Sequence, residues 1–226
     1  MKKAKTKTKT KMSRRKGVAP VPAKPGRAEK SAARRDAILE AALEEFAARG
    51  FEGGRLDDVA RRAGVAKGTI YLHFRDKEAL FQELVRSALS PFVATIESAG
   101  GKDMPLRAVF DHLAGAFVRE VLGTRRKDII RLILTEGRRF PKVAEFYYHE
   151  VPKRAFAAVR KLVKAAIDRG EIADDTLFWF PQLIIAPALV AIVWDGLFDK
   201  YEKLDAEAMM RAHFNLVFNA IERRPS

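Results

Sequence analysis

Four polar side chains of different chemistry lie close together in the segment 67–74, namely Lys67, Thr69, Tyr71 and His73. Their ammonium, hydroxyl, phenol and imidazole groups can donate hydrogen bonds to phosphate oxygens or meet the edges of bases. In a helix, Lys67, Tyr71 and Phe74 lie near one face because of their spacing. We expect the polar groups to contact DNA and Phe74 to lie in the core. The alternatives are a solvated lysine at 67, a core tyrosine at 71 and a surface imidazole at 73.

The sequence offers no comparable set of residues for catalysis or metal binding. His112, Glu136 and His149 lie in a helical region without the spacing of a metal motif such as HExxH. We find no glycine-rich phosphate loop and no nucleophile elbow. The chain has no cysteine, which excludes disulfides, thiol catalysis and cysteine-ligated zinc. We therefore expect a protein that is not an enzyme and needs neither cofactor nor metal.

The elements that must position segment 67–74 form a three-helix unit within residues 34–80. The first helix is long and amphipathic and stops at Gly50, and two short helices follow, near 56–63 and 67–74. The turn between the short helices contains Gly64, which suits the positive φ that such a turn needs. This is the helix-turn-helix plan, in which the second short helix enters the major groove of DNA.

Six motifs follow one another in register through this unit. They are Gly50-Phe51, Leu56-Asp57-Asp58-Val59-Ala60, Ala63-Gly64-Val65, Lys67-Gly68-Thr69-Ile70-Tyr71, His73-Phe74 and Lys77-Glu78-Ala79-Leu80. The string closely resembles the amino-terminal signature of tetracycline-repressor (TetR) family regulators. The resemblance implies a close approach of the backbone to DNA at Gly68 and a phosphate contact by Lys77. It implies DNA contacts for Lys67, Thr69, Tyr71 and His73.

Two places depart from the pattern of that family. The family usually has serine or threonine where Gly54 and Arg55 stand. Only Gly54 is then left to cap the first short helix, and we expect Arg55 to reach phosphate instead. Ala66 replaces a common serine, so one hydroxyl contact is lost. These changes affect individual contacts and leave the motif intact.

The whole chain is predicted to be all-α with about nine helices, because apolar residues recur at helical spacing and no strand-like alternation occurs. We expect a basic arm at 1–30, a helix-turn-helix DNA-binding domain at 31–78, and a ligand-binding and dimerisation domain at 79–226. Asp76 is the expected N-cap of the helix that leaves the DNA-binding unit. Pro91 predicts a kink or break in that helix.

The residues after the helix-turn-helix are apolar and rich in aromatics, which suits a cavity for a hydrophobic or aromatic compound. The alternative is that these side chains only fill a core. In TetR-like proteins this half binds a small-molecule inducer, and segments 131–141 and 146–147 look loosely similar to the AcrR-like or AefR-like subset. The residues that we assign to the ligand site are Phe110, Phe117, Glu136, Phe140, Tyr147, Trp179 and Gln182.

Residues 177–194 are eighteen residues with one polar side chain, a marginal length for a membrane span. Two prolines and flanking aspartates favour a helix buried in protein instead. The last helix, near 205–223, has an apolar face that is too hydrophobic to leave exposed. In the TetR family the last two helices pair with those of a second copy in a four-helix bundle. We expect a homodimer without membrane contact, with Leu189, Met210, Phe214, Val217 and Ile221 at its interface.

The net charge of +14 is concentrated in residues 1–30, whose twelve Lys/Arg and one acid, Glu29, give +11. Such a segment cannot bury enough apolar surface to fold, so we expect a disordered arm that ends at an N-cap, Ser31. A polycation attracts nucleic acid or an anionic membrane and does not choose between them. No apolar signal-peptide stretch follows it, and we expect a cytoplasmic protein.

Together these features predict a ligand-responsive, DNA-binding transcriptional regulator. We expect a repressor that binds a palindromic operator as a dimer and that a small hydrophobic or aromatic inducer releases. One alternative is an architectural protein that binds nucleic acid nonspecifically through its arm. The other is a membrane-anchored regulator that uses residues 177–198.

Overall fold

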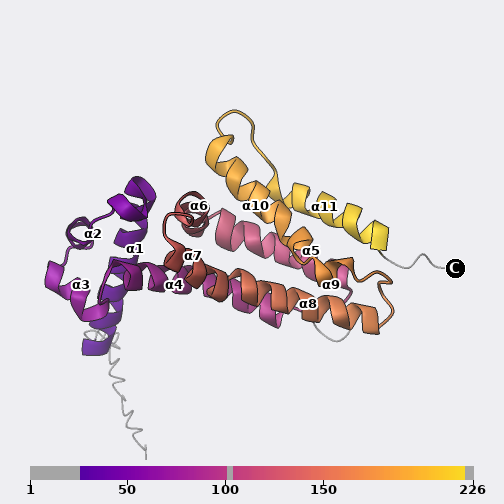
Figure 1. Ribbon diagram of the computed structural model, residues 1–226, viewed down its shortest axis with the longest axis horizontal. Helices are drawn as coiled ribbons and strands as arrows, with labels where there is room; N and C mark the ends of the chain where they lie inside the picture. The colour runs from indigo at the N-terminus through magenta and orange to yellow at the C-terminus, as the bar shows by residue number, and fades with distance from the viewer. Residues whose placement is uncertain (1–25, 101–103, 222–226) are drawn as a thin grey trace, which may run out of the picture.

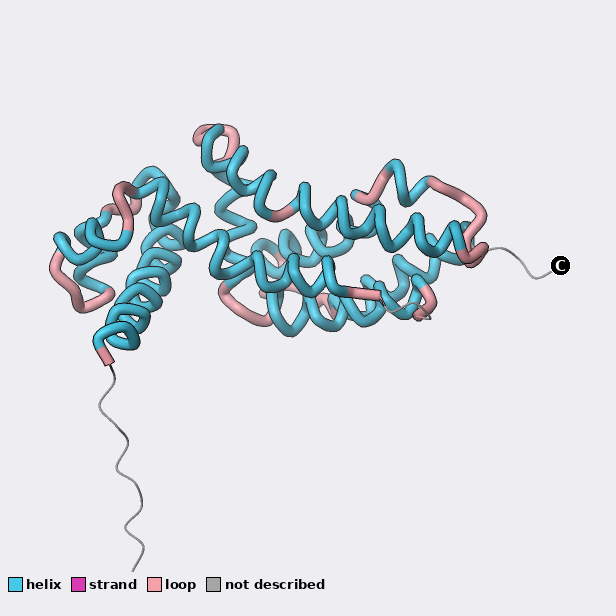
Figure 2. The backbone as a smooth tube through the Cα atoms, turned by 90° about the horizontal axis from the view of Figure 1, so that it is seen from below, coloured by secondary structure: helices cyan, strands magenta, loops and turns pink. Residues whose placement is uncertain are grey.

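The computed structural model describes residues 26–100 and 104–221, and these residues form an all-α fold without a strand, as expected. Figures 1 and 2 show an elongated molecule with α1–α3 at one end and a larger helical bundle behind them. The elements are α1 (Arg27–Gly53), α2 (Leu56–Arg62), α3 (Lys67–His73), α4 (Lys77–Ser98), α5 (Leu106–Phe117), the π-helical turn η1 (Val118–Leu122), α6 (Arg126–Glu136), α7 (Pro141–Glu150), α8 (Pro152–Asp168), α9 (Thr176–Trp179), α10 (Gln182–Leu197) and α11 (Ala206–Ile221).

Helix α1 begins five residues earlier than expected. Its N-cap is Gly26, whose backbone N–H donates to the Glu29 carboxylate over 2.7 Å, so the expected cap at Ser31 is wrong. Residues 27–30, which we assigned to the disordered arm, are therefore helical. The rest of that arm lies outside the described residues. At the other end Gly50 has a φ of 73°, which interrupts the helix before one last turn.

The helix-turn-helix is held together by small buried side chains. Gly64 has a φ of 65°, the positive value expected of the turn. Val59 of α2 and Ile70 of α3 are fully buried, and Ala60 is nearly so. Phe74, which directly follows α3, is also buried, as its spacing predicted. These contacts fix α3 against α2 and leave its other side free.

Helix α4 connects the three-helix unit to the bundle. Its N-cap is Asp76, whose carboxylate accepts a 2.7 Å hydrogen bond from the Ala79 N–H, as expected. The helix is continuous through Pro91, so of the expected kink or break the break does not occur. Because α4 packs against both α7 and α8, tertiary contacts support the helix on either side of the proline.

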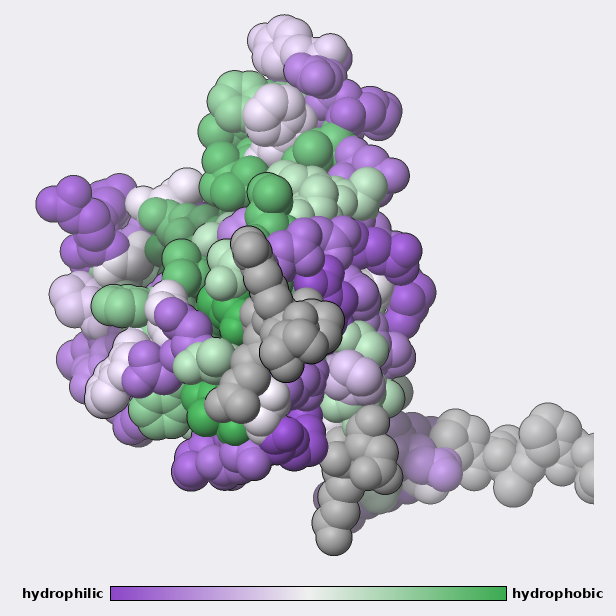
Figure 3. All heavy atoms as spheres, turned by 90° about the vertical axis from the view of Figure 1, so that its right-hand side faces the viewer, coloured by the Kyte–Doolittle hydropathy of each residue, from purple (hydrophilic) through white to green (hydrophobic). Residues whose placement is uncertain are grey.

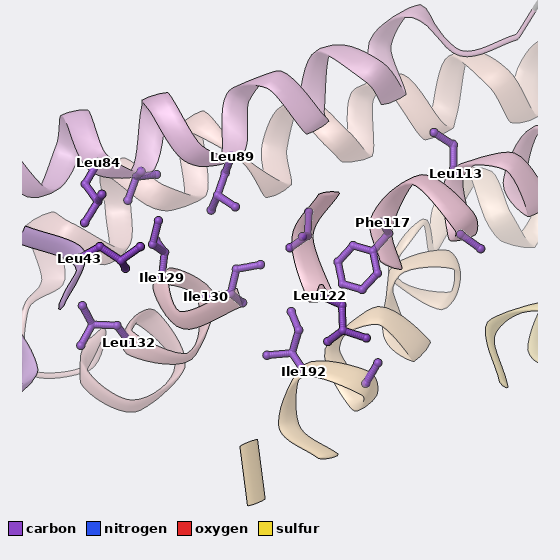
Figure 4. Packing of buried hydrophobic residues seen from close by; sticks show 14 of the residues in the cluster. Leu43, Leu84, Leu89, Leu113, Phe117, Leu122, Ile129, Ile130, Leu132 and Ile192 are labelled. Carbon is purple, nitrogen blue, oxygen red and sulfur yellow. The ribbon is translucent and has the colours of Figure 1, made fainter. Parts of the chain in front are cut away.

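The described residues form more helices than the roughly nine predicted for the whole chain, for two reasons that both involve proline. Helix α7 was not predicted; Pro141 and Pro152 occupy the first helical positions of α7 and α8 and so start helices. The apolar segment predicted as one helix is divided at Phe180 and Pro181 into α9 and α10. Buried leucine, isoleucine and phenylalanine side chains from several helices form the core (Figure 4).

No helix among the described residues combines the length and the apolar character needed to cross a membrane.

Candidate DNA-binding surface and ligand cavity

Helix α3 has one side in the core and one side in solvent. Ile70 is fully buried, whereas Tyr71 is 49% exposed and Leu72 is 83% exposed. A Cβ built on Gly68 would meet no atom within 4 Å, so the backbone there is open to a close approach. The sequence analysis assigned no role to Leu72; its place one step past Tyr71 is the signal that could have shown that it faces outward.

The remaining polar side chains of α3 differ in their exposure and in whether they already have a partner. Lys67 is exposed and forms a 2.8 Å ion pair with Asp57 of α2. This hydrogen bond and the charge of Asp57 raise the pKa of Lys67. Thr69 and His73 are half-buried. A phosphate could therefore reach Lys67 only by competing with a carboxylate already in place.

Lys77 and Arg55 stand at the edges of this surface. The Lys77 ammonium donates to the carbonyls of Glu52 and Gly54 over 2.9 and 3.0 Å and lies 4.9 Å from the Phe51 ring centroid. Desolvation by burial lowers its pKa. Lys77 thus holds the end of α1, which competes with the phosphate contact that the resemblance implied. Arg55 is exposed beside the start of α2.

A buried carboxylate that the sequence did not reveal fixes α2 to α1. Glu45 is 0% exposed, and its two oxygens pair with Arg62 at 3.1 Å and Arg49 at 3.2 Å. A charge at such depth is retained only when it is paired. Arg62 ends α2, so this cluster sets the position of the helix-turn-helix on the long first helix.

The bundle encloses a cavity of about 290 Å³ between α4, α5, α6, α7, α8, α10 and α11. Three of the residues assigned to the ligand site line it: Phe110, Phe117 and Tyr147. Figure 4 shows part of the core around this cavity, with Phe117 from α5, Leu122 from η1 and Ile192 from α10. Leu134 of α6 and Leu189 of α10 line the cavity and are also exposed on the surface, which places its mouth between these helices.

The cavity wall is almost wholly hydrocarbon. Tyr147 is the lining residue with a strong hydrogen-bonding side chain, and the others are aliphatic, aromatic, proline or methionine. Burial raises the pKa of Tyr147 to about 12. Among the described residues, its hydroxyl has no hydrogen-bond partner. The cavity thus offers a single polar group to a guest.

Two residues that we assigned to the ligand site, Glu136 and Phe140, lie instead at the seam between the three-helix unit and the bundle. Glu136 ends α6 and accepts a 2.8 Å hydrogen bond from the Phe51 N–H. Phe140 packs edge-on against Phe51 at 4.9 Å. Close by, Arg139 forms an ion pair with Glu52. These residues join the two parts of the molecule and do not touch the cavity.

Trp179 and Gln182 also lie outside the cavity. Trp179 is 63% exposed and donates its indole N–H to Asp175 of its own segment over 2.8 Å. Gln182 begins α10 and is exposed. The break at Pro181 separates α9 from α10, and both residues are left on the outer surface at that break.

Most of the α11 residues that we assigned to a dimer interface lie in the chain's own core. Met210, Phe214 and Ile221 are buried within the chain, and the Phe214 ring lies 5.8 Å from that of Phe110. Val217 is half-buried. Leu189, the fifth assigned residue, borders the cavity mouth. The strongest apolar stripe of α11 therefore serves the protein's own core.

A second, outward apolar stripe does occur on α10 and α11. Leu216 is 74% exposed on α11, and His213 joins the two helices through a 2.8 Å hydrogen bond to the Leu183 carbonyl. Figure 3 shows hydrophobic residues gathered below the projecting loop between α10 and α11. We call this set the α10–α11 patch; its members are Leu183, Val190, Val193, Leu197, Ala212 and Leu216.

Comparison with known proteins identifies the family. Residues 38–84 match the model for bacterial regulatory proteins of the tetR family, and residues 108–212 match the C-terminal domain of AefR-like transcriptional repressors. The transcriptional regulator UidR of Escherichia coli is 30% identical over 146 residues, which are 62% of this chain and 70% of UidR. The chain belongs to the tetR family.

Other TetR family members extend the likeness. The transcriptional regulator RutR of Escherichia coli is 31% identical over 139 residues, 60% of this chain, and the match spans 58% of the length of RutR. The structure of NalD from Pseudomonas aeruginosa superposes with a TM-score of 0.65 at 24% identity, covering 86% of this chain and all of that one. The fold is therefore shared across both parts of the molecule.

The structure explains one departure from the TetR pattern. Gly54 is the C-cap of α1, and Arg55 is the N-cap of α2 without a side-chain cap, so the expected cap by Gly54 is wrong. A Cβ on Gly54 would lie 2.5 Å from the Phe46 ring. Because Phe46 is fully buried, serine or threonine at this position would require the core to shift.

Proposed function

We propose that this TetR family member is a DNA-binding transcriptional repressor that binds a palindromic operator as a dimer in the cytoplasm and is released by a small hydrophobic molecule. The outer side of α3 is the observation that carries the proposal, because Tyr71 and Leu72 are exposed on a helix anchored by Ile70. NalD, which has the same fold, is described as the secondary repressor of a multidrug efflux pump, which supports repression.

In this proposal the residues of α3 make different kinds of contact with DNA. Tyr71 can donate to a phosphate or a base edge, and Leu72 can pack against the methyl group of thymine. Thr69 and His73 flank them with a hydroxyl and an imidazole. Gly68 lets the backbone approach the DNA closely. Arg55 supplies a phosphate contact, and Lys67 and Lys77 favour the phosphates through their charge.

Two copies are needed because one short recognition helix reads few base pairs. The α10–α11 patch supports the pairing, since it exposes large apolar side chains on two adjacent helices. An isologous contact would bury the patch of one copy against that of the other. A two-fold dimer would hold its α3 helices roughly 34–36 Å apart, the length of one turn of DNA.

The seam supports a route from cavity to DNA. Helix α6 contributes Ile130 and Leu134 to the cavity and ends at Glu136, which holds the Phe51 N–H. A guest that favours one position of α6 would bias the position of α1 and so the spacing of the α3 helices. It can shift that balance only by its difference in affinity for the two states.

Selection from a random duplex library tests the function. We expect enrichment of a palindrome whose affinity exceeds that of a scrambled duplex by roughly 10³-fold or more at physiological salt. A ratio near one would contradict the proposal and would favour nonspecific binding through the basic residues before Gly26.

A further inference from the structure

The composition of the cavity wall restricts which class of molecule can bind inside. This inference rests on the proposed function, in which the cavity is the site of the releasing molecule. Every lining residue other than Tyr147 offers hydrocarbon or, in Met210, a thioether. A charged group moved from water into such a wall finds no counter-ion, and burial of an unpaired charge is strongly unfavourable. A guest that lies wholly inside must therefore be uncharged.

Two charged residues next to lining positions are engaged elsewhere. Arg131, between Ile130 and Leu134 on α6, binds Asp195 and the Ile192 carbonyl. Glu150, one turn after Tyr147 on α7, accepts from Ser90 over 2.7 Å and from Arg154 over 3.0 Å. Both groups would have to break these bonds before they could meet an ion in the cavity.

Tyr147 supplies the polar end of the site. Its hydroxyl has no partner among the described residues, although the side chain is strongly desolvated, as the pKa of about 12 indicates. A phenol in that state stays protonated at neutral pH and donates a hydrogen bond. A guest that carries one acceptor oxygen would satisfy it.

The cavity volume sets the scale of the part of a guest that lies inside the mouth. At the roughly 30 Å³ that a water molecule occupies in the liquid, about 290 Å³ corresponds to roughly ten non-hydrogen atoms. We infer that the cavity binds an uncharged, mainly hydrocarbon molecule of about ten non-hydrogen atoms whose single polar group accepts a hydrogen bond from the Tyr147 hydroxyl. Carboxylates and ammonium ions of the same size are rejected.

Four probes of nearly equal size test this inference by calorimetry on the full chain without DNA. They are 1-octanol, octanoate, octylammonium and propylbenzene. We expect octanol to bind at least about 100-fold more tightly than either ion. Tyr147→Phe should weaken octanol binding roughly 3- to 10-fold and leave propylbenzene binding unchanged. Tyr148→Phe, on the exposed neighbour, is the matched control and should change neither.

A second pair of variants locates the binding. Ala155→Leu and Ala188→Leu add bulk to different walls of the cavity, on α8 and α10. Loss of octanol binding in either folded variant supports the cavity as the site. The inference is overturned if an ion binds within threefold of octanol, if neither octanol nor propylbenzene binds, or if both wall variants fold and bind octanol normally.

DNA binding, measured on the same preparations, separates this inference from the proposed function. Octanol selectivity without sequence-specific DNA binding overturns the repressor proposal and supports the cavity assignment. Specific DNA binding with equal affinity for octanol and octanoate supports the repressor proposal and overturns the cavity assignment.

Discussion

The surface of α3 and the cavity of the bundle are built in opposite ways. The first comes from consecutive residues on one short helix, with Tyr71 and Leu72 turned to solvent. The second is assembled from seven helices, by residues as far apart as Leu89 and Phe214. The first is open to a large, charged polymer from outside, and the second has room for a small apolar molecule. In the proposed function the dimer contact and the seam connect the two regions, and substitutions can separate their contributions.

The largest effect is expected when the two copies are separated. Leu216→Asp puts a charge on the α10–α11 patch without touching the core, because Leu216 is 74% exposed. We expect a folded monomer whose operator affinity falls by at least about 100-fold, since one half-site contact is lost. Sedimentation together with a DNA titration measures both. Tyr148→Asp, at another exposed position, on α7, should remain dimeric. A dimeric Leu216→Asp protein with full affinity would show that the interface lies elsewhere.

Tyr71→Ala tests the α3 surface alone. Removal of the phenol should cost about 1–3 kcal/mol of specific binding, because Tyr71 lies on the exposed side of the proposed recognition helix. Fluorescence anisotropy with the selected operator gives the change, and thermal unfolding checks the fold. Tyr148→Ala serves as the control for loss of an exposed tyrosine. Unchanged operator affinity in a folded Tyr71→Ala protein would remove this residue from the site.

Deletion of residues 2–25 separates charge from readout. It removes ten Lys/Arg and leaves α1, which begins at Arg27. We expect roughly tenfold weaker binding at physiological salt and a shallower salt dependence, because fewer counterions are released. The preferred sequence should stay the same. A changed preference on repeated selection would show that this segment reads bases.

Glu136→Ala tests the seam, with a smaller expected effect. It leaves the Phe51 N–H without its acceptor, whereas Glu136→Gln keeps an oxygen there. We expect operator affinity to change about threefold in the alanine variant and to be nearly unchanged in the glutamine variant. Hydrogen exchange should show faster exchange at Phe51 in the alanine variant only. Equal protection in both variants would mean that this bond does not hold the seam.

The smallest effect is expected for pH, because the affinity of the cavity for octanol should not depend on pH in the neutral range. Burial disfavours the phenolate of Tyr147 and raises its pKa to about 12, so the phenol is protonated throughout the neutral range. Octanol affinity should therefore be constant from about pH 6 to 9 and should fall only as the pH approaches that pKa. Calorimetry in matched buffers measures it. A change of more than about twofold within this range, absent in Tyr147→Phe, would contradict the assignment.

The α3 surface is formed by consecutive residues and the cavity by distant ones, and this difference decides how far the sequence could predict each region. The helix-turn-helix is local, so the order of residues around Gly64 and Tyr71 was sufficient to place the surface. Cavity residues are brought together by tertiary packing, and an aromatic residue such as Phe140 gives no sign of the partner it meets. Glu136 was read as a polar group of the pocket because its partner, Phe51, is far away in the sequence.

Helix α11 shows the limit of periodicity. The stripe through Met210 and Phe214 is the more hydrophobic and was assigned to the dimer, yet a strong stripe is what the chain's own core requires. The weaker stripe with Ala212 and Leu216 was not considered. A helix with two apolar faces cannot be oriented from its own sequence, because both faces satisfy the same period.

Half-site spacing tests the central claim most directly, namely that a two-fold dimer presents two α3 helices to one face of DNA. The affinity for the selected palindrome is compared with that for the same sequence with five base pairs inserted between the half-sites. The insertion rotates one half-site by about half a helical turn. A rigid dimer predicts a loss of at least about 100-fold. Equal affinity for both duplexes would contradict the claim, because it would mean that each recognition helix binds independently.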